Sequence, residues 1–154
     1  MANMDRNEVK TFPELTTQEL FQIYKLRVAV FVVEQKCYYQ EVDDDDLTAY
    51  HLMFKDDQNN ITAYARIIPE ENATVARIGR VVVDPNHRGD GLGRELVQTA
   101  LDRIPTLMPK TGKIVLAGQE YLNGFYKSFG FKNVSDVYLE DGIPHIDMEM
   151  QLQD

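Results

Sequence analysis

The sequence predicts a mixed α/β domain in which helices cover a sheet. Runs rich in β-branched residues alternate with segments whose apolar residues recur every three or four positions. The resulting order is strand, helix, three strands, helix, strand, helix and two strands. With 154 residues, of which 44% are hydrophobic and 27% charged, the chain has the size and composition of one globular domain, taken here as residues 1–154.

The first helix is expected to begin near Thr16, because Thr16 and Glu19 have the spacing of a capping box. Apolar residues at three- and four-residue spacing continue the helical period to Phe31. An acid-rich loop follows and runs from Glu34 to Asp46, with six acids against one base. Such a loop is either simply solvated or able to attract a cation.

Three strands are expected next, and the first two form a hairpin around a turn-rich segment at 56–60. Their ranges are 49–55, 61–68 and 74–83. A helix should begin near Gly91 and run to about Ile104, where Pro105 is expected to stop it.

The last third of the chain is expected to hold shorter elements. A short buried strand at 114–117 precedes a helix at 122–129, which Gly130 closes. Two antiparallel strands, 134–139 and 145–151, complete the sheet.

Composition excludes several classes of function. Sixteen basic residues face 25 acidic ones, for a net charge of −9, so nucleic-acid binding is not expected. No apolar run is long enough for a bilayer span, and residues 1–10 lack the apolar core of a signal peptide, so a cytoplasmic protein without membrane contact is expected. A single cysteine, Cys37, and three scattered histidines predict neither a disulfide nor a metal site.

The segment from Arg80 to Arg94 carries the clearest chemical signal. A strand ends at Val83, and glycines at 89, 91 and 93 open a helix. Free N–H groups at a helix start suit a phosphate, and glycine lets the phosphate approach the backbone closely. Arg88 and Arg94 can add charge-assisted hydrogen bonds. The glycines read G-x-G-x-G, which is neither the dinucleotide fingerprint nor a P-loop.

Arg88-x-x-Gly91-x-Gly93 resembles the Q/R-x-x-G-x-G/A segment of the GCN5-related N-acetyltransferases (GNAT). About 30 residues later, the segment from Asn123 to Phe131 resembles that family's N-x-x-A-x-x-F-Y-x-x-x-G-F helix in shortened form, with Gly124 as a departure. The segments 26–35 and 39–41 resemble its ElaA-type branch, and the likeness covers roughly residues 15 to 150.

The resemblance implies a mostly antiparallel sheet with a central splayed parallel strand pair, at Arg80–Val83 and Ile114–Gly118. It implies direct transfer of the acetyl group of acetyl-CoA to an amine, and a homodimer is a further expectation. The positions it assigns to the cofactor are Val81, Val82, Val83, Arg88, Gly89, Asp90, Gly91, Leu92, Gly93, Arg94, Asn123 and Tyr126.

The reaction needs a base for the amine, a donor for the oxyanion and an acid for the leaving thiolate. A backbone N–H near Val82 or Val83 is the candidate oxyanion donor. Tyr126 is the expected general acid, because a tyrosine is protonated at neutral pH; its alternative role is packing on the sheet.

The base stays open among Glu34, Glu41 and His51, acting directly or through a water molecule, and the last of these also fits a core histidine. Cys37 has no evident partner and is expected to be a bystander. The acid-rich loop fits a cationic amine acceptor. Besides the enzyme, two alternatives remain: an acetyl-CoA-binding sensor or partner module without turnover, and an unrelated nucleotide-binding protein.

Overall fold

The computed structural model describes residues 6–152, so both ends of the predicted 1–154 domain lie outside the described residues. Within that range eight strands form one sheet in the order β1-β2-β3-β4-β5-β8-β6, with β7 paired to β8. The strands are β1 (Arg6–Thr11), β2 (Tyr50–Lys55), β3 (Ile61–Glu70), β4 (Val75–Val83), β5 (Lys113–Gln119), β6 (Lys132–Asn133), β7 (Tyr138–Glu140) and β8 (Ile143–Gln151).

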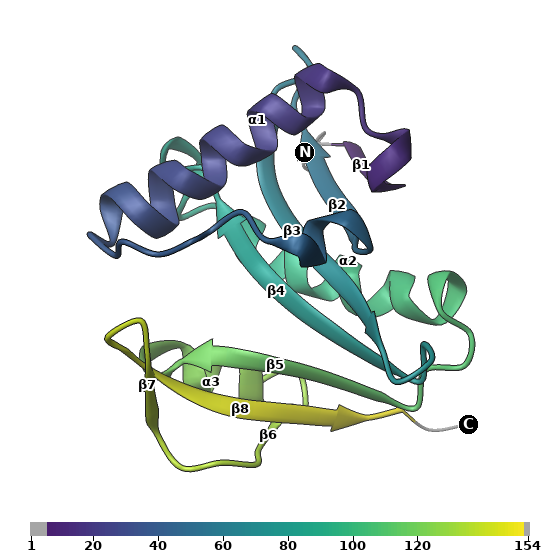
Figure 1. Cartoon of the computed structure of the whole chain (residues 1–154), viewed down its shortest axis with the longest axis vertical. Helices are drawn as coiled ribbons and strands as arrows, with labels where there is room; N and C mark the ends of the chain where they lie inside the picture. The colour runs from purple at the N-terminus through teal and green to yellow at the C-terminus, as the bar shows by residue number, and fades with distance from the viewer. Residues whose placement is uncertain (1–5, 153–154) are drawn as a thin grey trace.

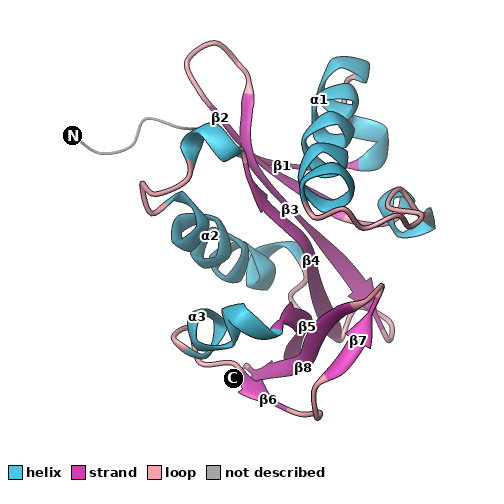
Figure 2. Ribbon diagram, turned by 90° about the vertical axis from the view of Figure 1, so that its left-hand side faces the viewer, coloured by secondary structure: helices cyan, strands magenta, loops and turns pink. Residues whose placement is uncertain are grey.

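Helices cover both faces of this sheet (Figure 2). One face carries α1 (Thr17–Arg27), and the other carries α2 (Leu92–Leu107) and α3 (Asn123–Lys127). The main core fills the space between the sheet and the helices α2 and α3, where apolar residues of α2 such as Leu96 and Ile104 are fully buried. A smaller core lies under α1. The mixed α/β architecture is therefore confirmed.

The predicted capping box at the start of α1 is present. Thr16 Oγ1 accepts a hydrogen bond from the N–H of Glu19 at 3.0 Å, and Glu19 Oε1 accepts one from the N–H of Thr16 at 2.8 Å. Glu19 also pairs with Lys55 of β2 at 2.6 Å and with Lys10 of β1 at 3.0 Å. This carboxylate therefore joins the start of α1 to two strands.

The strands β4 and β5 form the parallel pair among the antiparallel ladders, and they separate along their length. They pair between Val75–Arg77 and Lys113–Val115, after which they diverge toward their carboxyl ends (Figure 1). A splayed central pair is thus confirmed.

A bulge in β4 lies where the divergence begins. Tyr64 of β3 pairs with Val82 and Arg66 pairs with Gly79, so Arg80 and Val81 together oppose one β3 residue. Arg80 has a φ of 53°, in the left-handed region that side chains other than glycine rarely adopt. Because a bulge bends its strand, it helps to turn β4 away from β5.

Three predicted boundaries are wrong. The α-helix begun at Thr16 ends at Arg27, and a π-helix continues from Val28 to Glu34, with Gln35 donating to the carbonyl of Val30 at 3.1 Å. Pro105 lies inside α2 rather than beyond its end. A proline in the last turn removes one helical hydrogen bond, and Met108 still donates to the carbonyl of Ile104 at 2.7 Å.

The third wrong boundary is the strand predicted at 134–139, because β7 begins only at Tyr138. The segment before β7 is instead held to Asp147 of β8 by two hydrogen bonds. The N–H of Val134 donates to the carbonyl of Asp147, and the N–H of Asp147 donates to the hydroxyl of Ser135. No helix in residues 6–152 has the length and apolar character needed to cross a bilayer.

Candidate active site

The glycine loop, defined as Arg88–Gly93, connects the end of β4 to α2. Gly89 and Gly91 have φ values of 93° and 80°, so both positions favour glycine. Gly91 is the N-cap of α2 and offers no capping side chain. In the described part of the chain, the N–H groups of Gly91, Leu92 and Gly93, at the start of α2, have no backbone hydrogen-bond partner. The loop is therefore a set of free donors at the positive end of a helix, which suits a phosphate.

A cavity of about 570 Å³ opens beside this loop, and we call it the glycine-loop cavity. It extends from the loop to the diverging end of β4 and to α3. The predicted cofactor positions that line it are Val81, Val82, Val83, Arg88, Gly89, Gly91, Leu92, Gly93, Arg94 and Tyr126.

Two predicted cofactor positions do not line this cavity. The exposed Asp90 lies outside it, and so does Asn123. The side-chain amide of Asn123 donates instead to Asn133 Oδ1 of β6 at 2.8 Å, which turns it toward the edge of the sheet.

The two arginines of this segment already have partners. Both terminal nitrogens of Arg88 donate to the carboxylate of Glu34 at 2.8 Å, in an exposed pair. Hydrogen bonding from Arg88 holds the pKa of Glu34 below its usual value. Arg94 lies over the ring of Phe129, 4.4 Å from its centroid, and donates to the hydroxyl of Ser128. Glu34 therefore lies beside the glycine loop, where it is the ion-pair partner of Arg88.

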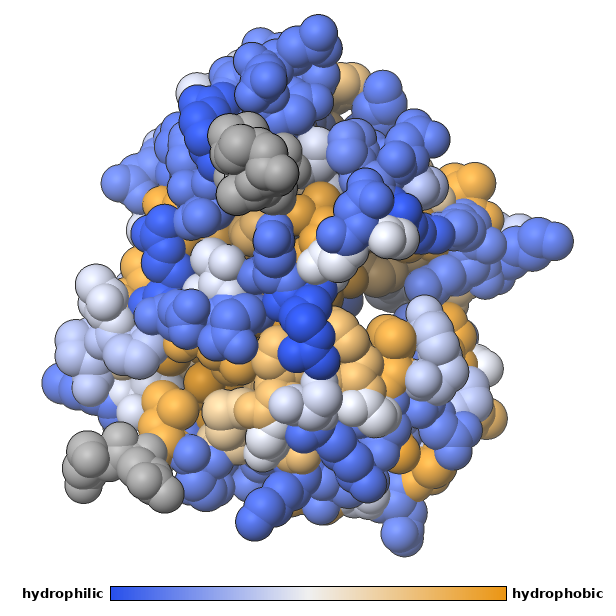
Figure 3. Space-filling view, turned by 180° about the vertical axis from the view of Figure 1, so that it is seen from behind, coloured by the Kyte–Doolittle hydropathy of each residue, from blue (hydrophilic) through white to orange (hydrophobic). Residues whose placement is uncertain are grey.

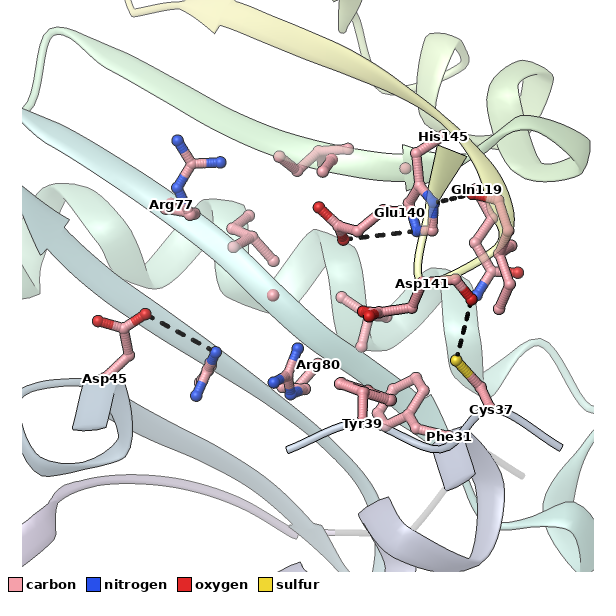
Figure 4. Close-up of a pocket in the computed structure, with 18 of the residues that line it drawn as sticks. Phe31, Cys37, Tyr39, Asp45, Arg77, Arg80, Gln119, Glu140, Asp141 and His145 are labelled. Atoms are coloured by element: carbon pink, nitrogen blue, oxygen red, sulfur yellow. Dashed lines mark hydrogen bonds and ion pairs between the residues drawn. The ribbon is translucent and has the colours of Figure 1, made fainter. Parts of the chain in front are cut away.

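A second cavity, of about 450 Å³, lies between the bulge of β4, the acid-rich loop and the β7–β8 hairpin. We call it the hairpin cavity, and Figure 4 shows its walls. Six residues line both cavities, namely Phe31, Gln35, Val81, Gln119, Leu122 and Tyr126. The two cavities therefore meet where β4 and β5 separate. Seen from behind, the surface is hollowed between the two halves of the molecule, with apolar residues around the hollow (Figure 3).

The backbone of β4 presents unpaired groups to this junction. Asp84 donates its N–H to the carbonyl of Thr62 in β3 at 2.8 Å. Ladder bonds alternate along an antiparallel strand, so Val82 also faces β3, and the N–H and C=O of Val83 face the gap. Of the two oxyanion donors considered, this geometry favours Val83.

Tyr126 lies at the junction of the two cavities. Its side chain is 6% exposed and packs edge-on against Phe125 and Phe131. A side chain at Gly118 would come within 3.1 Å of the Tyr126 ring, so the glycine makes room for it. Burial raises the pKa of Tyr126 to about 12, which keeps its hydroxyl protonated at neutral pH.

Three arginines pair closely with three of the six acids of the acid-rich loop. We call the group the charged cluster, and it consists of Arg27, Glu41, Asp43, Asp46, Arg66 and Arg80. Its formal charges, three positive and three negative, sum to zero. Half of the acids of the loop thus serve as internal counter-ions, and the attraction of a cationic amine by this loop stays a prediction.

Arg27 is the centre of this cluster and is completely buried. It bonds to Glu41 at 2.9 Å and to both oxygens of Asp46 at 2.7 and 3.0 Å. Burial by itself would raise the pKa of Asp46, but the hydrogen bonds from Arg27 and Arg66 outweigh it and lower that pKa. For Asp43, the bonds from Arg66 are the main cause of a lowered pKa.

The three base candidates from the sequence are not brought together. Glu41 is 3% exposed and is held between Arg27 and Arg80, at 2.9 and 2.7 Å. His51 is fully buried, with Nδ1 2.6 Å from the Tyr64 hydroxyl and Nε2 2.9 Å from the carbonyl of Asp46. None of Glu34, Glu41 and His51 lines the hairpin cavity.

Cys37 connects the acid-rich loop to the opposite wall of the hairpin cavity. Its thiol donates to the carbonyl of Asp141 at 3.3 Å, between β7 and β8. No base contacts the sulfur among the described residues. This position fits a packing role better than a nucleophilic one.

Sequence reasoning missed the polar groups of the β7–β8 hairpin. Glu140, Asp141 and His145 line the hairpin cavity (Figure 4). His145 lies opposite Gln119 of β5 in the antiparallel ladder, which places it beside the splayed strands. In the sequence, the one indication of a role for His145 is its position in the last predicted strand. That indication can be used only when the order of the strands in the sheet is known.

The chain matches a family model described as "Acetyltransferase (GNAT) domain" over residues 11–152. It is 51% identical over 143 residues to the UPF0039 protein C11D3.02c of Schizosaccharomyces pombe, covering 93% of this chain and 95% of that protein. Among solved structures, Escherichia coli ElaA is similar at 38% identity and a TM-score of 0.88, covering 96% of this chain and 100% of the other. An acyl-CoA N-acyltransferase from Pseudomonas aeruginosa is similar at 41% identity and a TM-score of 0.87, with 94% and 98% covered.

Proposed function

Because this chain belongs to the GNAT family, whose fold supports acyl-CoA-dependent N-acyl transfer, we propose that it moves an acetyl group from acetyl-CoA directly to a primary amine. The observation that carries the proposal is the row of free N–H groups in the glycine loop, which opens on a cavity that reaches Tyr126. A diphosphate on those donors would allow the rest of the cofactor to follow the gap between β4 and β5 to the junction of the cavities.

Each group at the junction has a role in this reaction. The N–H of Val83 stabilises the oxyanion that forms on the thioester carbonyl. Tyr126 gives its proton to the departing thiolate of CoA, because its hydroxyl is protonated and the residue lines both cavities. The amine approaches through the hairpin cavity.

The acceptor is proposed to be cationic, for a reason that differs from the charge run in the sequence. Glu140 and Asp141, from the β7–β8 hairpin, provide exposed carboxylates at the hairpin cavity. Glu140 approaches His145 at 3.9 Å, beyond hydrogen-bond distance. A protonated amine would be drawn toward these two acids. Location in the cytoplasm and assembly as a homodimer also stay predictions.

Thermal unfolding tests whether the cofactor binds. A ligand at about 100 times its dissociation constant stabilises a protein by about 2.7 kcal/mol, and each kcal/mol raises the Tm of a chain this size by roughly 2–4 °C. Acetyl-CoA should therefore raise the Tm by several degrees. No rise with millimolar acetyl-CoA, or an equal rise with ATP or NAD, would contradict the proposal.

Turnover is tested with acetyl-CoA and a panel of primary amines, followed by CoA release. Tyr126→Phe should lower kcat by about 100-fold, since a general acid contributes that much or more, while the acetyl-CoA-induced rise in Tm remains. Tyr38→Phe is the matched control, because Tyr38 is 88% exposed and lines neither cavity. Binding without turnover of any amine would indicate a sensor or partner module instead.

A further inference from the structure

We propose that His145 is the general base that takes the proton from the attacking amine. The inference rests on the proposed function, because it assigns the step that Tyr126 leaves open. A general base must lie within hydrogen-bond reach of the amine nitrogen and carry a free lone pair. His145 lines the cavity through which the amine is proposed to approach and keeps one ring nitrogen free, whereas none of the candidates from the sequence lines that cavity.

His145 is fixed in the wall of the hairpin cavity. It lies on β8 opposite Gln119, the last residue of β5, and Gln119 lines both cavities. The residue is 8% exposed, so the imidazole is largely shielded from bulk water. Figure 4 shows the ring on the same side of the cavity as Glu140 and Gln119. An amine in this cavity would therefore meet the ring on its way to the junction.

One hydrogen bond decides which nitrogen of His145 can act. Nδ1 lies 2.7 Å from the carbonyl oxygen of Ile143. A carbonyl can only accept, so Nδ1 carries the proton and Nε2 keeps its lone pair. Tyr138 stacks on the ring, with centroids 6.2 Å apart and planes 29° apart, and limits its rotation. The orientation of the free nitrogen is thus set before the amine arrives.

Glu140 supports the charge that a base acquires. Its Oε2 lies 3.9 Å from Nε2 of His145, too far for a hydrogen bond and close enough to stabilise an imidazolium. This carboxylate also faces the cavity, so it can hold the cationic form of the amine beside the base.

The other candidates are occupied or misplaced. Glu34 is bound by Arg88 on the far side of the junction, and Glu41 is buried between two arginines. Both ring nitrogens of His51 have partners. Among the three, no group offers a free lone pair to the hairpin cavity.

The proton balance of the step closes without another reactant. A protonated acceptor first releases one proton to solvent. The lone pair of the neutral amine then forms a bond to the thioester carbon, and Nε2 of His145 takes the proton that the nitrogen loses in this step. The C–S bond then breaks, its electron pair moves to sulfur, and the thiolate takes a proton from Tyr126. The imidazolium returns its proton to the tyrosinate through water, which leaves an amide and free CoA.

Several polar and charged groups face His145. Glu140 and Tyr138 come from β7, and Tyr138 itself donates to Asp147 of β8 at 2.5 Å. The remaining charged groups that line the same cavity are Asp43, Asp45, Arg66, Arg77, Arg80 and Asp141.

The test compares His145→Gln and His145→Ala with Glu149→Gln, a control on the same strand that pairs with Lys113 at 3.5 Å and lines neither cavity. We expect His145→Gln to lower kcat about 100-fold or more, with the KM for acetyl-CoA within about twofold. The fall in kcat/KM for the amine on the acidic side should become shallower, because glutamine takes up no proton while protonation of the amine itself still contributes. Added imidazole should restore part of the activity of His145→Ala.

The acetyl-CoA-induced rise in Tm confirms that each variant is folded. Activity of His145→Gln within about threefold of the unchanged protein, with the acidic side of the profile intact, would overturn the assignment of His145 alone. An unchanged protein that acetylates no amine would refute the proposed function, so the two failures are distinct.

Discussion

The glycine loop and the charged cluster carry the two strongest charge signals of the sequence, and the fold treats them in opposite ways. The N–H groups of Gly91–Gly93 have no backbone partner in the described chain, and these residues line a cavity. The acids of the cluster are matched by three arginines, two of which, Arg27 and Arg66, are nearly or completely buried. One region is thus ready for a ligand, while the other is neutralised by its own chain.

The difference shows that a run of charge does not by itself define a site. Backbone donors at a helix start can be satisfied only locally, so the glycine pattern predicts their availability. Carboxylates can be satisfied by any arginine that the fold brings near, and those here come from α1, β3 and β4. The pairing, and not the sequence run, decides what is free.

The largest expected effect comes from opening the charged cluster. Arg27→Met removes a buried arginine that pairs with both Glu41 and Asp46, and loss of one member of a buried pair costs about 3–5 kcal/mol. Thermal unfolding should show a fall in Tm of roughly 6–20 °C. Arg88→Met, which breaks an exposed pair, is the control. Equal falls for the two variants would show that the cluster and the loop do not differ as described.

The next effect comes from the backbone of the glycine loop. Gly91→Ala forces a side chain into a left-handed conformation, at a cost of about 1–2 kcal/mol, although a Cβ there meets no atom within 4 Å. Urea unfolding should show this loss, and calorimetry should show weaker binding of acetyl-CoA. Gly112→Ala, at a position with equal space and no left-handed φ, should change neither quantity. An unaffected Gly91→Ala would argue against a conformation fixed by glycine.

Acid should destabilise the folded protein by protonating carboxylates that are paired in it. The backbone N–H groups of the glycine loop do not titrate and should contribute nothing to this loss. Burial opposes ionisation of Glu19, but hydrogen bonds from Lys55, Thr16 and Lys10 outweigh it and lower its pKa to about 2. A lowered folded-state pKa contributes stability above the unfolded value, and this contribution is lost as pH falls from about 4.5 toward 2. The free energy of unfolding should fall over this range, and Glu19→Gln should make the fall shallower. An identical slope in the variant would contradict the pairing.

The smallest effect is expected at the exposed pair beside the loop. Glu34→Gln frees Arg88 from a competing carboxylate, so acetyl-CoA should bind a few-fold more tightly, with little change in Tm. Turnover should persist, since Glu34 does not line the hairpin cavity. A large loss of kcat would restore Glu34 as the base.

Much of the fold follows from local patterns in the sequence. The capping box at Thr16, the β2–β3 hairpin and the glycine-started α2 each depend on residues close together in the chain. The π-helix after Arg27 and the last turn of α2 beyond Pro105 were not predictable in this way. A helix continues past a residue such as Pro105 only if its packing against the sheet stabilises it, and this packing cannot be read from the local sequence.

Part of the candidate site likewise follows from local sequence, and part depends on contacts between distant segments. The positions around the glycine loop were predictable, because one contiguous segment forms them. The function of His145 depends on the pairing of β8 with β5, the turn that supplies the Ile143 carbonyl and the neighbouring Tyr138. The neutralisation of Glu41 likewise needs Arg27 and Arg80, which lie 14 and 39 residues away.

Amide NMR during a titration with CoA tests the central contrast most directly. We expect the largest shifts at the N–H groups of Arg88–Gly93, since these would donate to the diphosphate, and little change at Asp43 and Asp46, whose side chains are already paired. Saturating CoA that leaves the resonances of Arg88–Gly93 unmoved would contradict the account.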